Sequence, residues 1–281
     1  MIDWLGDNPL PIGRGAKSGV DWLIDNFGGF FDGLSQALQQ VVDGLLYMLE
    51  TPPTLAVIVV FGLLSYLVRR SLSAALFTVG GLLLIVNLGY WEETTKTLAL
   101  VIAATSLCMA IGVPLGIAAA RRPWLYALLR PVLDLMQTIP TFVYLIPALI
   151  LFGLGMVPGL IATIIFAVPA SVRLTRLGIV STPTTLIEAA QAFGATKWQV
   201  LTKIELPYAL PQIMAGLTQT IMLSLSMVVI AALVGADGLG VPVLRALNTV
   251  NIASGFEAGL CIVILAIILD RLFRVPDEGR T

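Results

Sequence analysis

The side chains that could do acid–base, nucleophilic or metal chemistry are few, and they form no catalytic pattern. The chain has no histidine, which excludes Ser-His-Asp and Cys-His nucleophilic systems and any histidine-ligated zinc or haem. Both cysteines, Cys108 and Cys261, lie inside apolar runs, where a thiol is expected to serve as a small core residue. The sequence therefore predicts no catalytic residue, no metal site and no cofactor bound by this chain.

One short segment looks like a nucleotide-binding loop. Residues 13–18 read Gly-Arg-Gly-Ala-Lys-Ser. The phosphate-binding pattern requires a glycine directly before the lysine and another glycine five residues earlier. Ala16 and Pro11 occupy those positions, and no strand–helix–strand pattern surrounds them. We expect no nucleotide to bind there.

Two long apolar segments each carry a strip of polar and other distinctive side chains. The first segment carries Met136, Gln137, Thr138, Thr141 and Tyr144, and the second carries Thr218, Gln219, Ser224, Ser226 and Met227. Pro140 and Pro147 are expected to kink the first segment and to free backbone carbonyls, so that it would line a cavity. Helix packing through small and hydroxyl residues is the alternative, and for any single position it is the stronger one.

A polar segment, residues 177–211, is predicted to form two short helices. Two capping boxes, at 185–188 and 196–199, would each satisfy the first free amides of a helix. Gly194 is placed to end the first helix in a left-handed conformation. Pro207 is predicted to end the second, because proline cannot continue a helix interior. A plain structured loop is the alternative.

The composition of the chain indicates the class of protein in which these residues lie. The chain has 281 residues, of which 58% are hydrophobic and 12% charged, with a mean hydropathy of +0.95. Soluble domains are about half apolar and about a quarter charged, so the composition predicts an integral membrane protein. A net charge of −1 argues against nucleic acid as a partner, and so does the pair of short helices, where only Lys197 and Lys203 are basic.

The predicted fold is an all-α bundle that spans the membrane. A bilayer core requires about 20 apolar residues per helix, and seven segments are candidates, the first of them short. They are 52–68, 72–90, 97–120, 132–153, 157–176, 212–235 and 255–272. Ahead of them, residues 22–49 place apolar side chains at steps of three and four. This spacing predicts an amphipathic helix on the outer membrane surface or against the bundle.

The charged residues suggest an orientation and a source of energy. With the C-terminus cytoplasmic and the N-terminus external, 12 of the 16 basic residues fall on the cytoplasmic side, as the positive-inside rule requires. The external four are Arg14, Lys17, Lys96 and Arg245. No candidate span has a charged residue near its middle, which argues against a proton- or sodium-coupled carrier.

Residues 188–207 resemble the EAA loop of ABC importer permeases. Glu-Ala-Ala, three residues, Gly, nine residues and then Ile-x-Leu-Pro match the family's pattern and spacing. The resemblance implies a coupling helix that seats in a groove of an ATP-hydrolysing subunit. It assigns the docking surface to Glu188, Ala189, Ala190, Gly194, Ala195, Lys197 and Trp198. Glu188 has a competing role as the acid of a capping box.

The resemblance extends over about residues 94–272, which are similar to the five-helix core of type I ABC importer permeases. Segments 133–147, 166–169 and 172–175 are similar to the importers of glycine betaine, proline betaine and choline. This implies a quaternary ammonium solute, with Phe142 and Tyr144 as aromatic candidates for its cation. Another small solute, such as an amino acid, is the alternative within the family. A secondary carrier or channel is the alternative outside it.

The resemblance also implies partners and boundaries. It predicts a homodimer, or a heterodimer, with two ATPase subunits that bind ATP and magnesium, an external solute-binding protein and surrounding lipid in a bacterial inner membrane. The expected segments are an external leader (1–50), two accessory spans (51–91), a permease core (92–272) containing the coupling loop (178–211), and a cytoplasmic tail (273–281).

A glycine-rich external segment, residues 235–240, is expected after the sixth span. Comparable segments in the family lie near the external gate and the docking surface for the binding protein. Asp237, Gly238, Leu239 and Gly240 are therefore candidates for that role, and a plain connector is the alternative.

Overall fold

The computed structural model describes residues 12–273, and every element in that range is a helix. Residues 1–11 and the predicted tail beyond Phe273 lie outside the described residues. In chain order the elements are α2 (Ile12–Glu50), α3 (Thr54–Arg69), α4 (Leu72–Asn87), α5 (Trp91–Arg121), α6 (Pro123–Thr138), α7 (Thr141–Phe152), α8 (Met156–Val180), α9 (Thr184–Ala192), α10 (Lys197–Val200), the π-helical segment η1 (Leu201–Glu205), α11 (Leu206–Ala232), α12 (Gly240–Asn248) and α13 (Ile252–Phe273).

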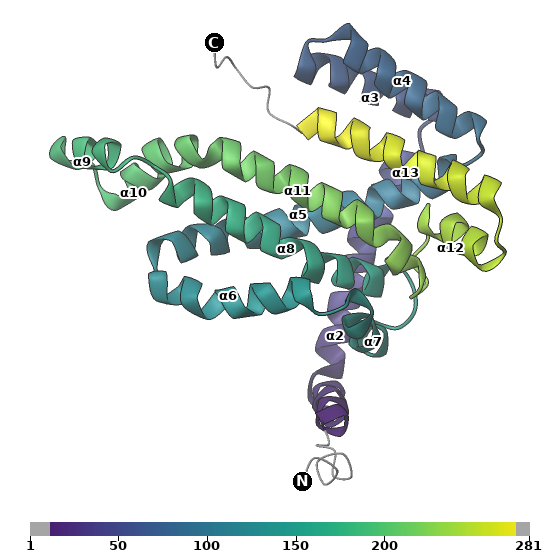
Figure 1. Ribbon diagram of the computed structural model, residues 1–281, viewed down its shortest axis with the longest axis horizontal. Coiled ribbons are helices and arrows are strands. Elements are labelled where there is room, and N and C mark those ends of the chain that lie inside the picture. Colours follow the sequence, from purple (N-terminus) through teal and green to yellow (C-terminus); the bar gives the residue numbers. More distant parts are fainter. Residues whose placement is uncertain (1–11, 274–281) are drawn as a thin grey trace, which may run out of the picture.

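Three long helices, α5, α8 and α11, form the centre of the molecule and run along its long axis (Figure 1). Small residues let them approach closely. A Cβ atom added at Gly116 would lie 2.7 Å from both the Thr175 Cβ and the Val172 carbonyl oxygen, and one added at Gly178 would lie 2.9 Å from the Ala209 Cβ. Such contacts are the usual basis of helix packing in membranes, and they make these three helices the core.

A second group consists of α3, α4 and α13 (Figure 1). The buried Thr78 hydroxyl of α4 donates a hydrogen bond of 3.1 Å to the Ser65 hydroxyl of α3. Arg69 Nε donates to the Arg271 carbonyl at 2.6 Å, and the Arg271 guanidinium lies 4.4 Å from the centre of the Phe77 ring. Polar contacts thus join all three helices.

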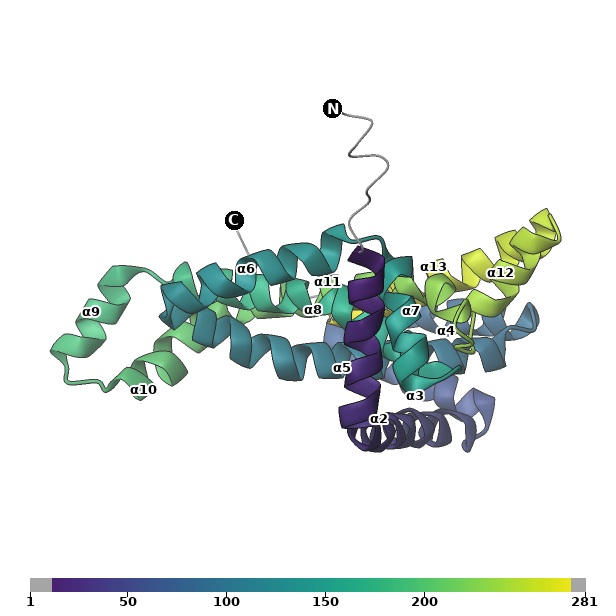
Figure 2. The same ribbon diagram turned by 90° about the horizontal axis from the view of Figure 1, so that it is seen from below.

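The predicted amphipathic helix is confirmed as α2. Its C-terminal half packs against α5, α7 and α8, where Leu38 and Val42 are buried. Its N-terminal half projects across the long axis of the bundle (Figures 1 and 2), with Trp22 57% exposed and Phe30 63% exposed. Packing against the bundle therefore holds for the second half of the helix.

The fourth predicted span, 132–153, is broken at Pro140 rather than only kinked there. The chain forms α6 and α7 there, and their axes bend by 96° at the break. Ile139 has an extended backbone with ψ 130°, as steric contact with the ring of Pro140 requires, and Pro140 then opens α7. Pro147 lies within α7, so the first proline breaks the helix whereas the second is accommodated.

The described helices also refine the number of spans. Within residues 12–273, α5, α8, the continuous helix Lys197–Ala232 and α13 are each long and apolar enough to cross a membrane. Counting the bent pairs α2–α3 and α6–α7 as one span each raises the number to six. Helices α3 and α4 have only 16 residues each. The seven predicted segments are therefore helical, but two are short and one is broken.

Candidate functional site

Helices α9 and α10 form a tip that projects from one end of the bundle (Figures 1 and 2). All 9 residues of α9 are described, and none of them is buried. Two aromatic side chains of the tip are exposed, Phe193 at 93% and Trp198 at 69%. A tip with exposed aromatic residues and no core of its own has the properties of a surface that another protein covers.

The turn between α9 and α10 is formed as the sequence predicts. Gly194 has φ 79°, a left-handed conformation that favours glycine. The capping box at the start of α10 is present: the Gln199 backbone N–H donates to the Thr196 hydroxyl at 3.3 Å, and the Thr196 backbone N–H donates to Gln199 Oε1 at 2.8 Å. Both features fix the angle between the two helices.

Two other local predictions for this segment are wrong. The box at Thr185 and Glu188 does not form, because α9 begins two residues earlier than predicted, with Pro183 in the cap position. Thr185 is consequently inside the helix, where it cannot act as a cap. Pro207 does not end the second helix. The segment η1 continues directly into α11, and the Leu206 N–H donates to the Leu201 carbonyl, five residues back. A proline is tolerated there because it occupies the first turn of α11.

The structure brings all predicted coupling-loop residues to this tip. Glu188 and Ala189 are exposed on α9, and Ala190 is half-buried. Gly194 follows in the turn. Ala195 is half-buried, and Lys197 and Trp198 are exposed at the start of α10.

The bend between α6 and α7 divides the first predicted polar strip. Met136 and Gln137 are half-buried and Thr138 is exposed at the end of α6, whereas Thr141 is half-buried at the start of α7. Phe142, also on α7, is 56% exposed. The two halves of the strip therefore belong to helices with different directions.

Tyr144 lies in an apolar cluster between α7, α8 and α11. Its neighbours there include Phe166 and the buried Met227. Within the described residues its buried hydroxyl has no hydrogen-bond partner. The structure thus brings Tyr144 and Met227 together, although 83 residues of sequence separate their positions.

The second predicted strip is divided between two faces of α11. Ser224 is buried and donates to the Thr220 carbonyl at 2.8 Å, a bond within the helix that suits packing. Gln219 is exposed. Gln219 and Ser226 are therefore open to solvent or to another chain, whereas Ser224 and Met227 are buried.

The glycine-rich segment 235–240 is packed against α5. The Leu239 N–H donates to the Thr97 hydroxyl at 2.8 Å, and Leu239 is fully buried. Gly238 has φ 126°, and a Cβ atom there would lie 3.1 Å from the Thr97 amide nitrogen. Asp237 is exposed, with its carboxylate 3.8 Å from Lys96 Nζ. At Gly240 the irregular segment ends and the chain enters α12, a helix for which the sequence analysis made no prediction.

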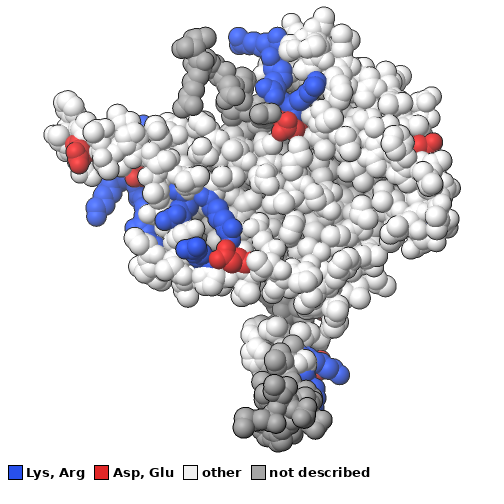
Figure 3. Space-filling view, in the orientation of Figure 1, with Lys and Arg blue, Asp and Glu red and all other residues white. Residues whose placement is uncertain are grey.

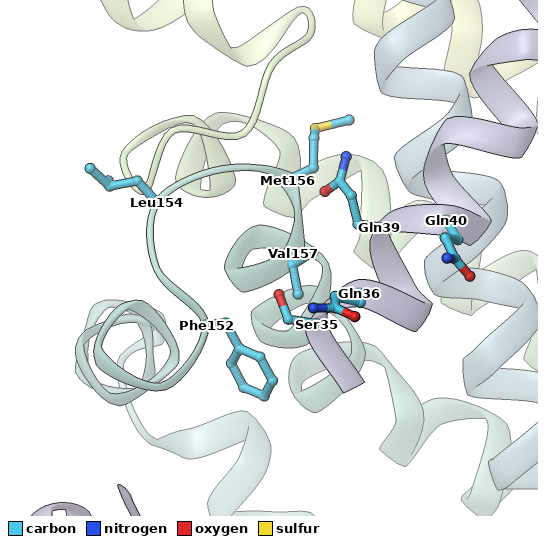
Figure 4. Close-up of a pocket in the computed structure, with 8 residues that line it drawn as sticks. All are labelled: Ser35, Gln36, Gln39, Gln40, Phe152, Leu154, Met156 and Val157. Atoms are coloured by element: carbon cyan, nitrogen blue, oxygen red, sulfur yellow. The ribbon is translucent and has the colours of Figure 1, made fainter. Parts of the chain in front are cut away.

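A pocket of about 410 Å³ lies between α2 and the connection from α7 to α8 (Figure 4). It is lined by Ser35, Gln36, Gln39, Gln40, Phe152, Leu154, Met156 and Val157. Sequence reasoning missed it because more than a hundred residues separate its two walls. Within residues 12–273 no group of three or more Cys, Asp or Glu side chains is placed to hold a metal ion.

Basic side chains gather at two places on the bundle, and a further group lies on the projecting N-terminal half of α2 (Figure 3). One lies at the α6–α8–α10 end, where Arg173 bonds Asp134 at 2.6 Å and Arg121 bonds Glu205 at 3.0 Å. The other lies where α3 and α13 end. Most of the remaining surface in this view is uncharged, as expected for helices in lipid.

Residues 112–279 match the family described as binding-protein-dependent transport system inner membrane component. The chain is 47% identical over 263 residues to the glycine betaine transport system permease protein OpuAB of Bacillus subtilis, covering 94% of this chain and 93% of that protein. It is 44% identical over 272 residues to the glycine betaine/proline betaine transport system permease protein ProW of Escherichia coli, covering 97% of this chain and 77% of that protein.

Among solved structures, the chain resembles an inward-facing conformation of the MetNI methionine ABC transporter. The TM-score is 0.58 at 26% sequence identity, over 64% of this chain and 91% of that one. The matched fold, the length of the family match and the identity to full-length permeases agree with one another. The chain belongs to the family of inner-membrane components of binding-protein-dependent transport systems.

Proposed function

We propose that this chain is the membrane-spanning subunit of an ATP-driven importer for a quaternary ammonium compatible solute such as glycine betaine, proline betaine or choline. The observation that carries the proposal is the 47% identity to a glycine betaine permease over nearly the whole of both chains. ATP and magnesium would bind to two separate ATPase subunits, and an external binding protein would deliver the solute. A second copy of this chain would complete the pathway.

The α9–α10 tip is the proposed docking site for the ATPase. Glu188, Ala189, Ala190 and Gly194 would form its core, with Ala195, Lys197 and Trp198 beside them. Small alanine side chains permit close approach, and exposed aromatic residues gain most from burial in a groove of the partner. Because ATP is cytoplasmic, this end of the bundle would face the cytoplasm, with the N-terminus external and the C-terminus cytoplasmic.

The proposed solute pathway passes the α6–α7 bend. Aromatic faces attract quaternary ammonium groups without needing a hydrogen bond. Phe142 is exposed near the bend, and Tyr144 lies two residues further along α7. Met136, Gln137, Thr138, Thr141 and the exposed Gln219 are the polar candidates, whereas the burial of Ser224 and Met227 favours a packing role for them.

Docking is tested by introducing a charge at the tip. In the complex with its ATPase, Ala189→Asp or Ala190→Asp is expected to abolish co-purification of the ATPase while membrane insertion continues. Ala253→Asp, at an exposed alanine in the first turn of α13, is the matched control. Normal assembly of both tip variants would remove the docking assignment.

Transport is tested in proteoliposomes that hold the permease and the ATPase, with the binding protein outside. Radiolabelled glycine betaine should enter only when ATP is enclosed. Uptake without ATP or ATPase would indicate a secondary carrier or channel instead. Competition by methionine but not by choline would indicate an amino-acid importer, the solute class of the structural relative.

A further inference from the structure

We infer that Arg121 is a positioning residue that transmits movement of the α9–α10 tip to α5. The inference rests on the proposed docking of an ATPase at that tip. Arg121 is the last residue of α5, a core helix, and its side chain contacts the segment that connects the tip to α11. Its role would be to convert displacement of the tip into displacement of the core.

The Arg121 guanidinium has two acceptors. Its Nη2 donates to the Lys197 carbonyl at 3.1 Å and to Glu205 Oε2 at 3.0 Å. Lys197 is the first residue of α10 and Glu205 is the last residue of η1. The Arg121 side chain therefore contacts both ends of the segment that leads from the tip to α11. Glu205 is only 13% exposed and Arg121 35% exposed, and a charge-assisted bond that is partly shielded from water is stronger than one on an open surface.

This contact is the outermost side-chain link between the tip and the bundle. Among the hydrogen bonds that the structure gives for residues 184–205, those formed with another part of the chain all involve Arg121. Helix α9 buries none of its residues. Further in, Val200 at the end of α10 is buried, and Leu201 is buried in a cluster against Ile179 and Ala209, so apolar packing begins only at the end of α10.

The covalent connection from the tip to α11 has an irregular hydrogen-bond pattern. It runs through η1, a π-helical segment of 5 residues, and such segments mark positions where a helix can change its winding at small cost. Pro207 follows directly and lacks an N–H for the helix ladder. A movement of α9 and α10 that reached the bundle only through this joint would be partly absorbed by it. The bond from Arg121 to the Lys197 carbonyl bypasses the joint, and the bond to Glu205 holds the last residue of the joint against α5.

From Arg121 the movement would pass into tightly packed helices. On α5, a Cβ atom at Gly116 would lie 2.7 Å from the Val172 carbonyl of α8, and the Ser171 hydroxyl donates to the Cys108 carbonyl at 3.0 Å. Two helices in such contact move together, because separating them would open a void. Arg121 thus connects the tip to a rigid α5–α8 unit.

The test measures how many ATP molecules are hydrolysed for each solute molecule imported by the reconstituted complex. Arg121→Glu and Glu205→Arg alone should raise this ratio roughly five- to tenfold, because each places like charges at the contact. The double variant should lower the ratio again, since it restores an opposite-charge pair but not the bond to the Lys197 carbonyl. Arg121→Gln, which adds no repulsion, should give an intermediate ratio.

Arg122→Glu is the matched control, because Arg122 is adjacent, exposed and has no side-chain hydrogen bond or ion pair among the described residues. It should leave the ratio unchanged. Co-purification of the ATPase with Arg121→Glu and Arg121→Gln should equal wild type, which separates transmission from docking. The inference is overturned if the single variants keep the wild-type ratio, if the double variant is no better than either single one, or if Arg121→Gln loses the ATPase. Loss of docking in the Ala189 variant with no effect at Arg121 would leave the proposed function intact.

Discussion

Replacing Gly116 by alanine should destabilise the bundle, although alanine is the better helix former. The new Cβ would lie 2.7 Å from the Val172 carbonyl oxygen and from the Thr175 Cβ. Ordinary contact begins near 3.4 Å, so α5 and α8 would have to separate by about 0.7 Å, the difference between 3.4 and 2.7 Å. The obstructing oxygen belongs to the backbone and cannot rotate away. Overpacking of this kind costs about 1–3 kcal/mol, more than the gain of up to about 1 kcal/mol from helix propensity.

The assay is unfolding of the purified permease by sodium dodecyl sulfate in mixed micelles, followed by circular dichroism. Gly116→Ala should lower the free energy of unfolding by up to about 2 kcal/mol, the balance of the two terms. Gly80→Ala is the matched control, since Gly80 is helical and a Cβ there would meet nothing within 4 Å. It should be neutral or stabilising by up to about 1 kcal/mol. Equal stability of the two variants would refute the packing argument.

Three further changes test local features of the site. Thr97→Val leaves the buried Leu239 N–H without its acceptor and should cost about 1–3 kcal/mol in the same assay, whereas Thr97→Ser should keep the bond and the stability. Gly194→Val places a β-branched residue at φ 79°, a strain of about 1–3 kcal/mol, and should weaken ATPase co-purification, with Ala192→Val as control; undiminished co-purification would count against the tip geometry. Tyr144→Leu should raise the KM for glycine betaine uptake about fivefold, because an aromatic face contributes about 1 kcal/mol to cation binding, whereas Tyr144→Phe should change it little. Equal KM values for the two would remove Tyr144 from the pathway.

Sequence spacing predicted the features that depend on neighbouring residues. The Thr196 capping box and the left-handed Gly194 follow from residues within a few positions of each other. The same reasoning failed at Thr185, because Pro183 already provides an extended residue before the helix and moves its start by two positions. Local signals compete, and the sequence does not state which of two neighbouring caps is used.

The bend between α6 and α7 shows a second kind of failure. Pro140 correctly indicated a disturbance of the helix, but hydropathy averages over residues 132–153 and carries no direction. The size of the bend, 96°, depends on where α7 finds apolar partners such as Met227 of α11. Contacts between distant segments therefore set an angle that the proline only permits.

The charged contacts at the α9–α10 end were invisible in the sequence for a related reason. Arg121 and Glu205 are separated by 84 residues, and Asp134 and Arg173 by 39. The sequence analysis counted Arg121 and Arg173 as topology signals, each on its own, and gave neither of them an acidic partner. In the structure they form pairs, and each pair joins two different helices.

The Arg121 contact and the α5–α8 packing differ in physical character. Along α5 and α8, glycine, serine and threonine bring the helices together without any charge, and packing of that kind is rigid. At the α9–α10 end, the Arg121–Glu205 pair joins α5 to η1 through an ionic contact of long side chains that is partly shielded from water. The packed helices cannot rearrange without opening voids. A force applied at the tip would therefore pass through the Arg121 contact and displace α5 and α8 as one body.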